Sequence, residues 1–486
     1  MKTITIDPIT RLEGHGKISI FLNEKGNVAD AYLQVPELRG FEKFCQGRPV
    51  EEMPRITSRI CGVCPEAHLM ASAKACDAVY HMDIPPTAKK LRELLYAIFY
   101  VTDHTTHFYA LAGPDFVIGP DAPKAQRNIL GIIHKVGVEI GGKVVALRGM
   151  CHELIKNMGG KAVHPVGALP GGMSKGMTKE EQKEFIAKGK EAVEFAQFTI
   201  QLFNDIVLKN KEYVDLILSD TFTHRTYNMG LVDKNNHVNF YDGDIRVVGP
   251  DGKEFVKFKP DKYLNHIEEH IEPWSYLKFP FLKKVGWKGF VDGPDSGIYK
   301  ATPLSRLNAS DGMATPLADA EHDRMYETLG GKPVQQTLAT HWARIIELLY
   351  AAERWVELAG DSDITGPDYR MVPTETPDEG VGVVEAPRGT LYHHYKTDEN
   401  GILREANLIV GTTNNNAPIN MSVKKAAKSL IKNGKVNDGL LNMVEMAFRA
   451  YDPCFGCATH TLPGQMPLII RIMDKDRRLL EEIRRD

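Results

Sequence analysis

The sequence lacks long hydrophobic runs, and its net charge is small. No apolar segment among the 486 residues approaches the roughly 20 residues that a membrane-spanning helix needs. The amino terminus, Met1 to Pro8, reads as a strand and a turn and not as a signal peptide. A net charge of −3 gives no reason to expect a nucleic acid or an anionic membrane as a partner. These absences favour a globular cytoplasmic protein with a large core.

Cysteine is scarce as well, with seven in the chain. An odd number in a long chain does not fit a disulfide framework. Four of them form two Cys-x-x-Cys pairs near opposite ends, Cys61/Cys64 and Cys454/Cys457. The other three are too few for an all-cysteine iron–sulfur cluster, so electrons from any redox reaction would pass to another protein. The chain also lacks Gly-x-Gly-x-x-Gly after a strand, and we expect no NAD site in it.

The two pairs predict one shared site for a soft metal. Thiolates suit such an ion, and about 390 residues separate the first pair from the second. Zinc ribbons place their second pair roughly 15–20 residues after the first. This site therefore closes only when the two ends of the chain meet. Spacing alone leaves a structural zinc site open as an alternative.

Both pairs are predicted to lie on helices. On a helix, Cys61 and Cys64 share one face, and His68 follows one turn later. Asp452 is expected to cap a second helix that has Pro453 at its first position, unless the carboxylate lies beside the metal. The second cysteine pair would then occupy the first turns, where backbone N–H groups favour thiolates.

Helical periodicity dominates the rest of the chain, and we predict an α+β fold that is predominantly helical. A bundle of long helices forms its core, with small antiparallel sheets at the N-terminus and near residues 380–413. Residues 230–330 are rich in aromatics, Gly and Pro and predict an α+β elaboration. Helices are expected over residues 54–80, 87–112, 121–158, 179–212, 335–360, 418–432 and 437–450, and N-terminal strands over 3–7, 17–22 and 29–35.

We interpret residues 1–486 as one large domain. Its predicted parts are an N-terminal sheet region (1–50), a helical core with the metal site (51–229 and 331–460), the elaboration (230–330) and a C-terminal extension (461–486).

The residues around the cysteines resemble the two signatures of nickel–iron hydrogenase large subunits. These are Arg59–Cys64 with His68, and Asp452–Cys454 with Cys457 and His460. The resemblance covers essentially the whole chain in the correct order. Other matching segments are Arg11–His15, Glu37–Glu42, Asp103–Tyr109, His164–Gly172 and Glu385–Gly389.

Within that family, the chain looks most like the cytosolic, bidirectional, NAD-linked branch. Respiratory members usually have Trp near the position of Asn414. The segments behind this finer assignment are Gln34–Glu42, Gly113–Phe116, Arg388–Tyr395 and Ala458–Pro467.

The resemblance implies a nickel ion bound by all four cysteines and an iron that carries cyanide and carbon monoxide. Cys61 and Cys454 resemble the terminal nickel ligands, and Cys64 and Cys457 the bridges to iron. The implied reaction is the reversible splitting of dihydrogen into two protons and two electrons. A terminal thiolate such as that of Cys454 can accept one of the protons.

Arg388, next to Pro387, resembles the arginine that contacts a cyanide, which suits a planar guanidinium. A surface salt bridge is the simpler reading of this arginine. Thr412 or Thr413 would supply a hydroxyl to the other cyanide, and the sequence does not choose between them.

Three further residues take roles from the resemblance. Asp103, like Asp452, resembles a carboxylate above nickel, although a lone aspartate of this kind is more often a helix-surface residue. Glu13 resembles a proton-relay glutamate, with a turn residue paired to Arg11 as the alternative. His68 resembles a donor to a bridging sulfur, whereas a histidine on an apolar helix face is usually a satisfied core residue.

Two features concern the C-terminus. Glu42 and His460 match positions that flank a magnesium ion in the family. The family's extension is removed after the histidine by a maturation endopeptidase, and here 26 residues follow His460. We expect the tail to end in a charged helix over residues 474–486 and predict that active protein ends at His460. A permanent helix that closes the domain is the alternative.

The implied partners are flavin- and NAD-binding diaphorase subunits and an iron–sulfur small subunit. Alternatives within the family use another acceptor, such as coenzyme F420, ferredoxin with a heterodisulfide, or two acceptors by bifurcation. A hydrogen sensor is a further possibility. Outside the catalytic family stands the complex I-like structural subunit, which lacks the four cysteines.

Overall fold

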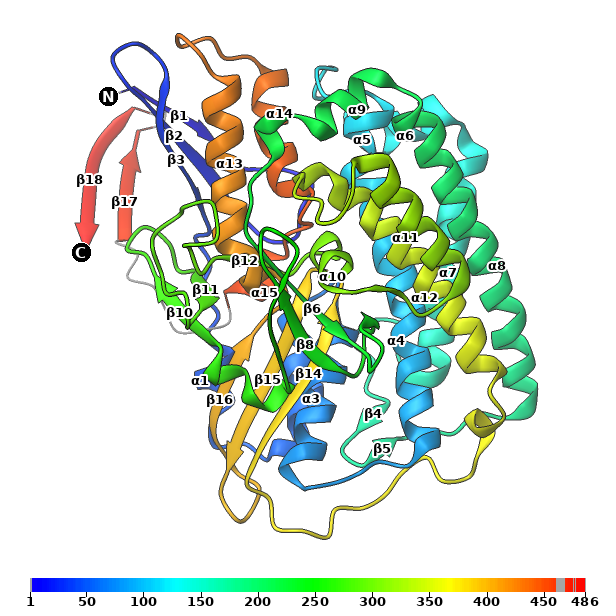
Figure 1. The fold of residues 1–486 in the computed structure, drawn as a ribbon. Coiled ribbons are helices and arrows are strands. Elements are labelled where there is room, and N and C mark those ends of the chain that lie inside the picture. Colours follow the sequence, from blue (N-terminus) through cyan, green and yellow to red (C-terminus); the bar gives the residue numbers. More distant parts are fainter. Residues whose placement is uncertain (1, 460–467, 475, 477, 486) are drawn as a thin grey trace.

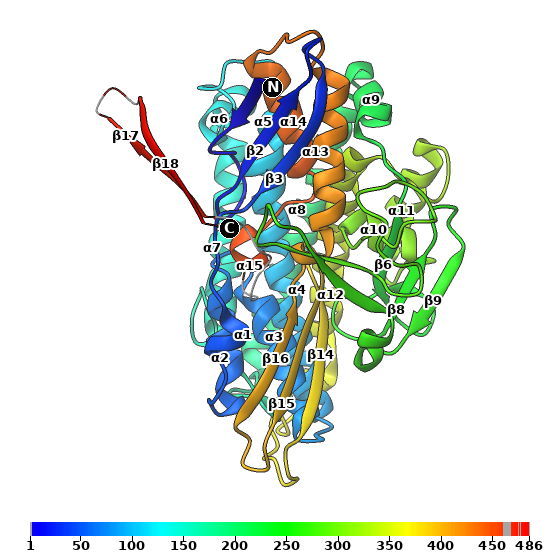
Figure 2. The same cartoon turned by 90° about the vertical axis from the view of Figure 1, so that its left-hand side faces the viewer.

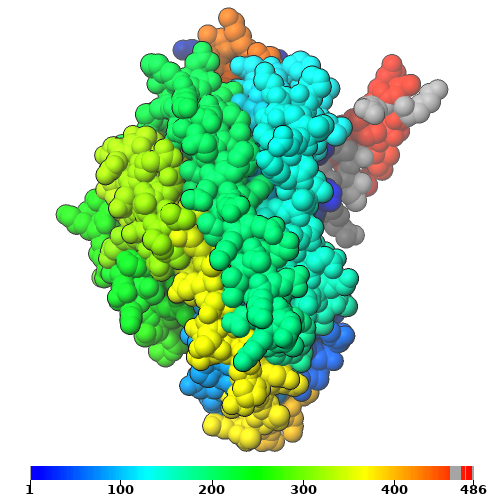
Figure 3. Space-filling model, turned by 90° about the vertical axis from the view of Figure 1, so that its right-hand side faces the viewer, coloured from blue at the N-terminus to red at the C-terminus, as the bar shows by residue number. Residues whose placement is uncertain are grey.

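A bundle of long helices forms the frame of the molecule (Figure 1). The computed structural model describes residues 2–459, 468–474, 476 and 478–485. Helix α12 packs against both α4 and α8, and α4 packs against α7. Helices α7 and α8 cover the outer side of the bundle (Figure 3). Their bounds are α4 (Pro86–Thr106), α7 (Val138–Gly159), α8 (Lys179–Phe203) and α12 (Thr340–Gly360).

Local sequence explains where these helices begin. Thr178 and Glu181 form a capping box at the start of α8, with each side chain bonded to the backbone N–H of the other. Helix α4 follows Pro85, and Pro86 takes its first position, where a missing N–H costs nothing. Trp342 and Trp355 of α12 are fully buried, so this helix lies in the core of the bundle.

Two antiparallel sheets flank the bundle, as predicted (Figure 2). The first contains β1 (Lys2–Ile6), β2 (Lys17–Leu22) and β3 (Val28–Gln34), and it packs on α13 (Asn416–Leu430). The second contains β14 (Glu379–Ala386), β15 (Gly389–Thr397) and β16 (Leu403–Ile409), and it covers α3 (Pro65–Val79). Gly380 and Gly382 permit this approach, because a Cβ there would lie 2.3 and 2.1 Å from backbone atoms of α3.

The region between residues 227 and 329 forms the predicted α+β elaboration. Its larger sheet runs in the order β13-β7-β6-β8-β9, with β12 added beside β6, and a two-stranded sheet pairs β10 with β11. Helix α10 links the elaboration to α12. The elements are β6 (Tyr227–Val232), β7 (His237–Val238), β8 (Asp244–Val248), β9 (Glu254–Phe258), β10 (Ile267–Ile271), β11 (Lys278–Leu282), β12 (Tyr299–Lys300), α10 (Pro303–Ala309), β13 (Gly312–Met313) and α11 (Pro316–Leu329).

Several predicted helices are interrupted. The segment 54–80 divides into α2 (Met53–Thr57), a 3-10 turn and α3, with the first cysteine pair between them. The segment 121–158 divides into α6 (Ile129–Val136) and α7 at Gly137, whose φ of 96° favours glycine. Beyond α4 the helix passes through a π-helical turn into α5 (Gly113–Val117). The segment 179–212 likewise ends in a π-helical turn, followed by α9 (Lys211–Leu218).

The C-terminal tail is a hairpin, and the predicted helix over 474–486 is wrong. Strands β17 (Leu468–Met473) and β18 (Leu479–Arg485) pair antiparallel, and the hairpin stands away from the body (Figures 2 and 3). The isoleucines of β17 favour a strand, and β18 supplies a pairing partner across a short turn. None of the helices in the described residues is long and apolar enough to cross a bilayer.

Candidate metal centre

The four cysteines of the two pairs meet at one buried point. The Sγ atoms of Cys61 and Cys64 lie 2.9 Å apart, as do those of Cys454 and Cys457. Across the pairs, Cys61 and Cys454 are separated by 3.3 Å, and Cys64 and Cys457 by 3.6 Å. No side chain of the four is more than 4% exposed, and none is in a disulfide. The structure thus brings together all four predicted thiol ligands.

The first pair lies in a turn and not on a helix, which corrects the prediction. Cys61 has extended backbone angles, and Cys64 is the N-cap residue of α3. The Cys61 sulfur accepts the backbone N–H groups of Val63 and Cys64 at 3.2 and 3.0 Å. Although burial opposes it, hydrogen bonds from the other thiols hold the pKa of Cys61 well below its usual value.

The second pair occupies a short helix, α15 (Phe455–Ala458), whose N-cap is Cys454. Asp452 and Pro453 therefore do not begin a helix as predicted, and Asp452 has a positive φ of 55°. The Cys454 backbone N–H donates to Thr412 Oγ1 at 2.9 Å. Burial raises the pKa of Cys454 and of Cys457 well above the usual value, so a soft dication would have to displace protons here.

Glu13 lies against this second pair. Its Oε2 is 2.8 Å from the Cys454 sulfur and accepts the Gly456 backbone N–H at 2.9 Å. An isolated parallel β-bridge pairs the backbones of Glu13 and Cys454, so the N-terminal and C-terminal segments of the chain are held together at the site. A side chain at Gly456 would displace the Glu13 carboxylate, because a Cβ there would lie 2.5 Å from Glu13 Oε1. Burial, followed by the nearby Cys61, raises the pKa of Glu13.

Arg388 joins the two predicted aspartates above the cysteines. Its Nη1 donates to Asp103 Oδ2 at 3.0 Å, and its Nη2 lies 2.8 Å from Asp452 Oδ2. Burial raises the pKa of Asp452 to about 7, against the opposing charges of Arg388 and Arg344. Arg388 is 3% exposed, so the surface salt bridge considered from sequence is wrong.

A buried ion-pair network behind this loop was not found from sequence. Arg306 of α10 donates to both carboxylate oxygens of Glu347, at 2.6 and 2.7 Å, and lies 3.1 Å from Glu385. It also donates to the carbonyl oxygens of Ala386 and, at 3.4 Å, Pro387, so it fixes the backbone just before Arg388. A charged residue inside an apolar helix, as Glu347 is in α12, was the available signal.

The remaining predicted residues occupy less central positions. His68 is fully buried on α3, with Nδ1 3.1 Å from His393 Nε2. Glu42 Oε1 accepts the Leu408 backbone N–H at 2.7 Å, and burial raises the pKa of this carboxyl. The magnesium prediction paired Glu42 with His460, which lies outside the described residues.

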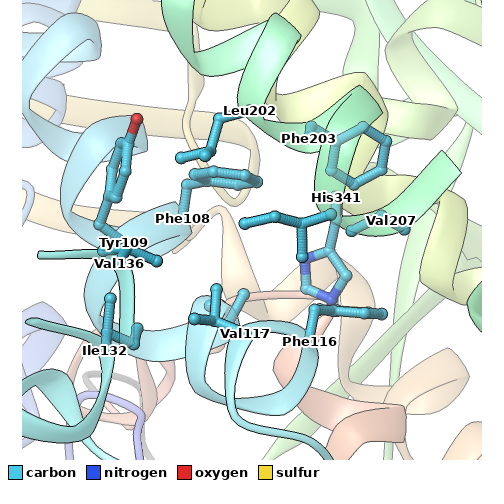
Figure 4. Close-up of a pocket in the computed structure, with 13 residues that line it drawn as sticks. Phe108, Tyr109, Phe116, Val117, Ile132, Val136, Leu202, Phe203, Val207 and His341 are labelled. Carbon is cyan, nitrogen blue, oxygen red and sulfur yellow. The ribbon is translucent and has the colours of Figure 1, made fainter. Parts of the chain in front are cut away.

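A small apolar cavity of about 30 Å³ lies in the bundle near the site (Figure 4). Phe116, Val117 and Val207 are among its lining residues, and His341 turns its ring toward it. That ring stacks on His107 with centroids 5.7 Å apart, and His107 Nε2 lies 3.8 Å from Asp452. Two stacked imidazoles, those of His341 and His107, therefore lie between the cavity and Asp452.

The residues present fit a metal centre that holds a polar non-protein group in addition to a metal ion and its four thiolates. Four thiol donors suit nickel as well as zinc. A closed structural zinc site needs no carboxylate or guanidinium beside it, whereas here Glu13 contacts the Cys454 sulfur and the Arg388 charge lowers the pKa of Cys61. Among the described residues, several buried polar atoms here have no hydrogen-bond partner, and Arg388 Nε and Asp103 Oδ1 are two of them. Such atoms are rare in folded proteins and fit a polar non-protein group.

Known proteins support this interpretation. The family model described as "Nickel-dependent hydrogenase" matches residues 39–136 and 295–460, and one described as "HoxL-like" matches residues 3–38. An iron–sulfur subunit of the F420-non-reducing hydrogenase of Archaeoglobus profundus is 50% identical over 485 residues, which is 100% of both chains. The "NAD-reducing hydrogenase HoxS subunit beta" of Cupriavidus necator is 38% identical over 497 residues, 99% of each chain.

A crystal structure of an NAD+-reducing [NiFe]-hydrogenase in the H2-reduced state has the same fold. It superposes with a TM-score of 0.89 at 36% identity and covers 95% of this chain and 100% of that one. The chain belongs to the nickel-dependent hydrogenase family. Within that family it is a catalytic large subunit of the nickel–iron type, which confirms the resemblance seen in the sequence.

Proposed function

We propose that this chain carries the site at which dihydrogen is reversibly converted into two protons and two electrons. The convergence of Cys61, Cys64, Cys454 and Cys457 at one buried point supports this proposal most directly. Cys61 and Cys454 would be terminal ligands of nickel, and Cys64 and Cys457 would bridge nickel to iron. When bound, the nickel–iron centre supplies the position where dihydrogen is split and takes up the electrons.

Cys454 and Glu13 form the proposed exit for protons. The Cys454 sulfur accepts a proton from the reaction and passes it to Glu13 Oε2, 2.8 Å away. The pKa of Glu13 is raised in the direction of neutral pH, and a proton-relay group works best when its pKa lies near the working pH. The bond to the Gly456 N–H holds the carboxylate in place during the transfer.

Arg388 and Thr412 are the proposed contacts for anionic ligands of the iron, two cyanides beside one carbon monoxide. Asp103 and Asp452 fix the Arg388 guanidinium from two sides, and its Nε has no partner among the described residues. Thr412 touches the site, because its oxygen accepts the Cys454 N–H, and its hydroxyl proton stays available for donation. We therefore favour Thr412 over Thr413 for this role.

The electron acceptor has two candidates. An NAD-linked complex with diaphorase subunits and an iron–sulfur small subunit is supported by the NAD-reducing relatives at 36% and 38% identity. An acceptor other than coenzyme F420 is supported by relatives at 50% and 42% identity that are named F420-non-reducing. Hydrogen-dependent reduction of NAD, F420 and ferredoxin by the purified cytoplasmic complex would distinguish these candidates. NAD reduction without added subunits would support the first.

We also propose that Glu42 helps to hold a magnesium ion and that the tail is removed on maturation. The carboxylate of Glu42 retains one oxygen beyond the bond to Leu408. The hairpin β17–β18 stands clear of the body, which leaves the hairpin itself open to a maturation endopeptidase. Intact-mass measurement of active enzyme should give a chain that ends at His460, and a full-length mass would reject the cleavage.

Elemental analysis combined with a hydrogen-oxidation assay tests the proposed function. We expect nickel and iron in equal amounts in this chain, with hydrogen-dependent reduction of an artificial dye. Zinc in place of nickel would reveal a structural site. Neither metal would point to a complex I-like structural subunit, and both metals with very slow turnover would point to a hydrogen sensor.

A further inference from the structure

A fully buried polar chain connects α3 with β15. His68 Nδ1 lies 3.1 Å from His393 Nε2, and His393 Nδ1 lies 2.6 Å from the hydroxyl of Tyr395. The Tyr395 hydroxyl in turn lies 2.8 Å from Ser72 Oγ. All four side chains are completely buried. His68 and Ser72 are one turn apart on α3, and His393 and Tyr395 are two residues apart on β15, so each pair shares one face.

Both elements start at the metal centre. Helix α3 begins directly after Cys64, and β15 begins directly after Arg388. His68 lies in the first turn of α3, four residues beyond Cys64, which is the N-cap residue of this helix. The polar chain therefore fixes the imidazole of His68, which follows the first cysteine pair closely in the sequence.

Hydrogen-bond chemistry sets the direction of this chain. A neutral imidazole carries one N–H and one lone pair, so the donor to one histidine fixes the tautomer of the next. We assign the Tyr395 hydroxyl as the donor to His393 Nδ1, because at 2.6 Å this nitrogen lies nearer than Ser72 Oγ at 2.8 Å and is the more basic acceptor, and Ser72 can donate to the tyrosine oxygen. Burial raises the pKa of Tyr395, so the phenol keeps the proton that it donates.

The consequence reaches His68. With His393 Nδ1 accepting, His393 carries its proton on Nε2 and donates to His68 Nδ1. His68 must then carry its own proton on Nε2. With the opposite direction, His68 Nε2 would carry a lone pair and could only accept a hydrogen bond. We propose that His393 and Tyr395 are positioning residues that hold His68 in the Nε2–H tautomer, so that it donates a hydrogen bond to a thiolate of the metal centre.

This inference rests on the proposed function, because it assigns a task to His68 at that centre. It predicts that the rate depends on the hydrogen bond that His393 donates to His68, and less on the size of the side chain at position 393. In metal sites, partners of this kind typically contribute 10–100-fold to activity or metal affinity.

The test compares three variants of the purified complex. H393F keeps a ring but removes both nitrogens, whereas H393Q keeps an N–H donor and an oxygen acceptor. Y395F removes only the hydroxyl. H394F is the matched control, because His394 faces the other side of β15 and contacts Tyr263 and the half-exposed Glu379. Nickel content, the hydrogen-oxidation rate, and the potential and magnetic resonance spectrum of the nickel are measured.

We expect H393F and Y395F to lose 10–100-fold in rate and to shift the nickel potential and spectrum. H393Q should recover most of the rate, and H394F should match the wild type. The inference is overturned if Y395F and H393F both keep wild-type rate and potential, or if H393Q fails as fully as H393F. A wild-type complex without nickel or hydrogen oxidation would instead refute the proposed function, and this inference with it.

Discussion

Replacing Glu13 with glutamine isolates the proposed proton exit. The Cys454 sulfur and the Gly456 N–H lie 2.8 and 2.9 Å from Glu13 Oε2, so a glutamine oxygen can still accept the backbone N–H. The variant keeps the shape of the site and loses the group that can take up a proton. General acid–base groups contribute typically 10²–10⁴-fold to a rate, which corresponds to roughly 3–5 kcal/mol of the activation barrier.

Steady-state hydrogen oxidation with an artificial acceptor measures this loss, and elemental analysis measures the nickel. We expect E13Q to lose 10²–10⁴-fold in rate at unchanged nickel content. In the wild type the rate should also fall as pH drops through the raised pKa of Glu13, because the protonated carboxyl cannot act as a base. This limb of the pH profile should be absent from the variant.

Glu37 offers the matched control, since it lies in the same N-terminal region and pairs with the exposed His15. E37Q should retain the wild-type rate. An E13Q enzyme with normal nickel and more than half of the wild-type activity would refute the reasoning, because protons would then leave the Cys454 sulfur by another path.

Three other substitutions test the surroundings of the site. G456A should lower the rate 10–100-fold, because the new Cβ would lie 2.5 Å from Glu13 Oε1; G62A, where a Cβ meets nothing within 4 Å, should be nearly neutral. Burial raises the pKa of Glu66 from 4.5 to about 8. The folded chain thus holds a proton that the unfolded chain has lost, and the free energy of unfolding should fall as pH rises from 4.5 to about 8, by at most roughly 5 kcal/mol. Denaturant titrations between pH 5 and 8 should show this slope in the wild type and not in E66Q, and equal slopes would contradict the assignment. R388K leaves one buried carboxylate unpaired and should cost about 3–5 kcal/mol of stability in thermal unfolding. An unchanged melting temperature would argue against a buried guanidinium that pairs with both Asp103 and Asp452.

The sequence predicted the meeting of the four cysteines because their flanking residues match a family signature. Periodicity likewise predicted the long helices, since burying one stripe of side chains requires that pattern. It failed at Cys61–Cys64, where apolar neighbours continue a helical pattern although the chain unwinds to bring both sulfurs to one point. The positive φ of Asp452 was equally hidden, because tertiary contacts set it.

Other features depend on partners that are distant in sequence. Arg306 holds the backbone that precedes Arg388, yet 80 residues separate it from Ala386, and no local pattern links them. The same holds for His393 and His68, which are 325 residues apart. The C-terminal hairpin was mistaken for a helix because its charged second strand was judged without the isoleucine-rich strand that pairs with it.

The parallel bridge between Glu13 and Cys454 has a consequence for the timing of biosynthesis. A ribosome adds about 5–20 residues per second, so roughly 20–80 s pass between the appearance of the first thiol pair and that of the second. Throughout that interval the early thiols lack half of their ligand set. Nickel can therefore be captured only after translation has delivered the second pair, and the cell must keep the waiting thiols reduced and away from competing zinc and copper until then.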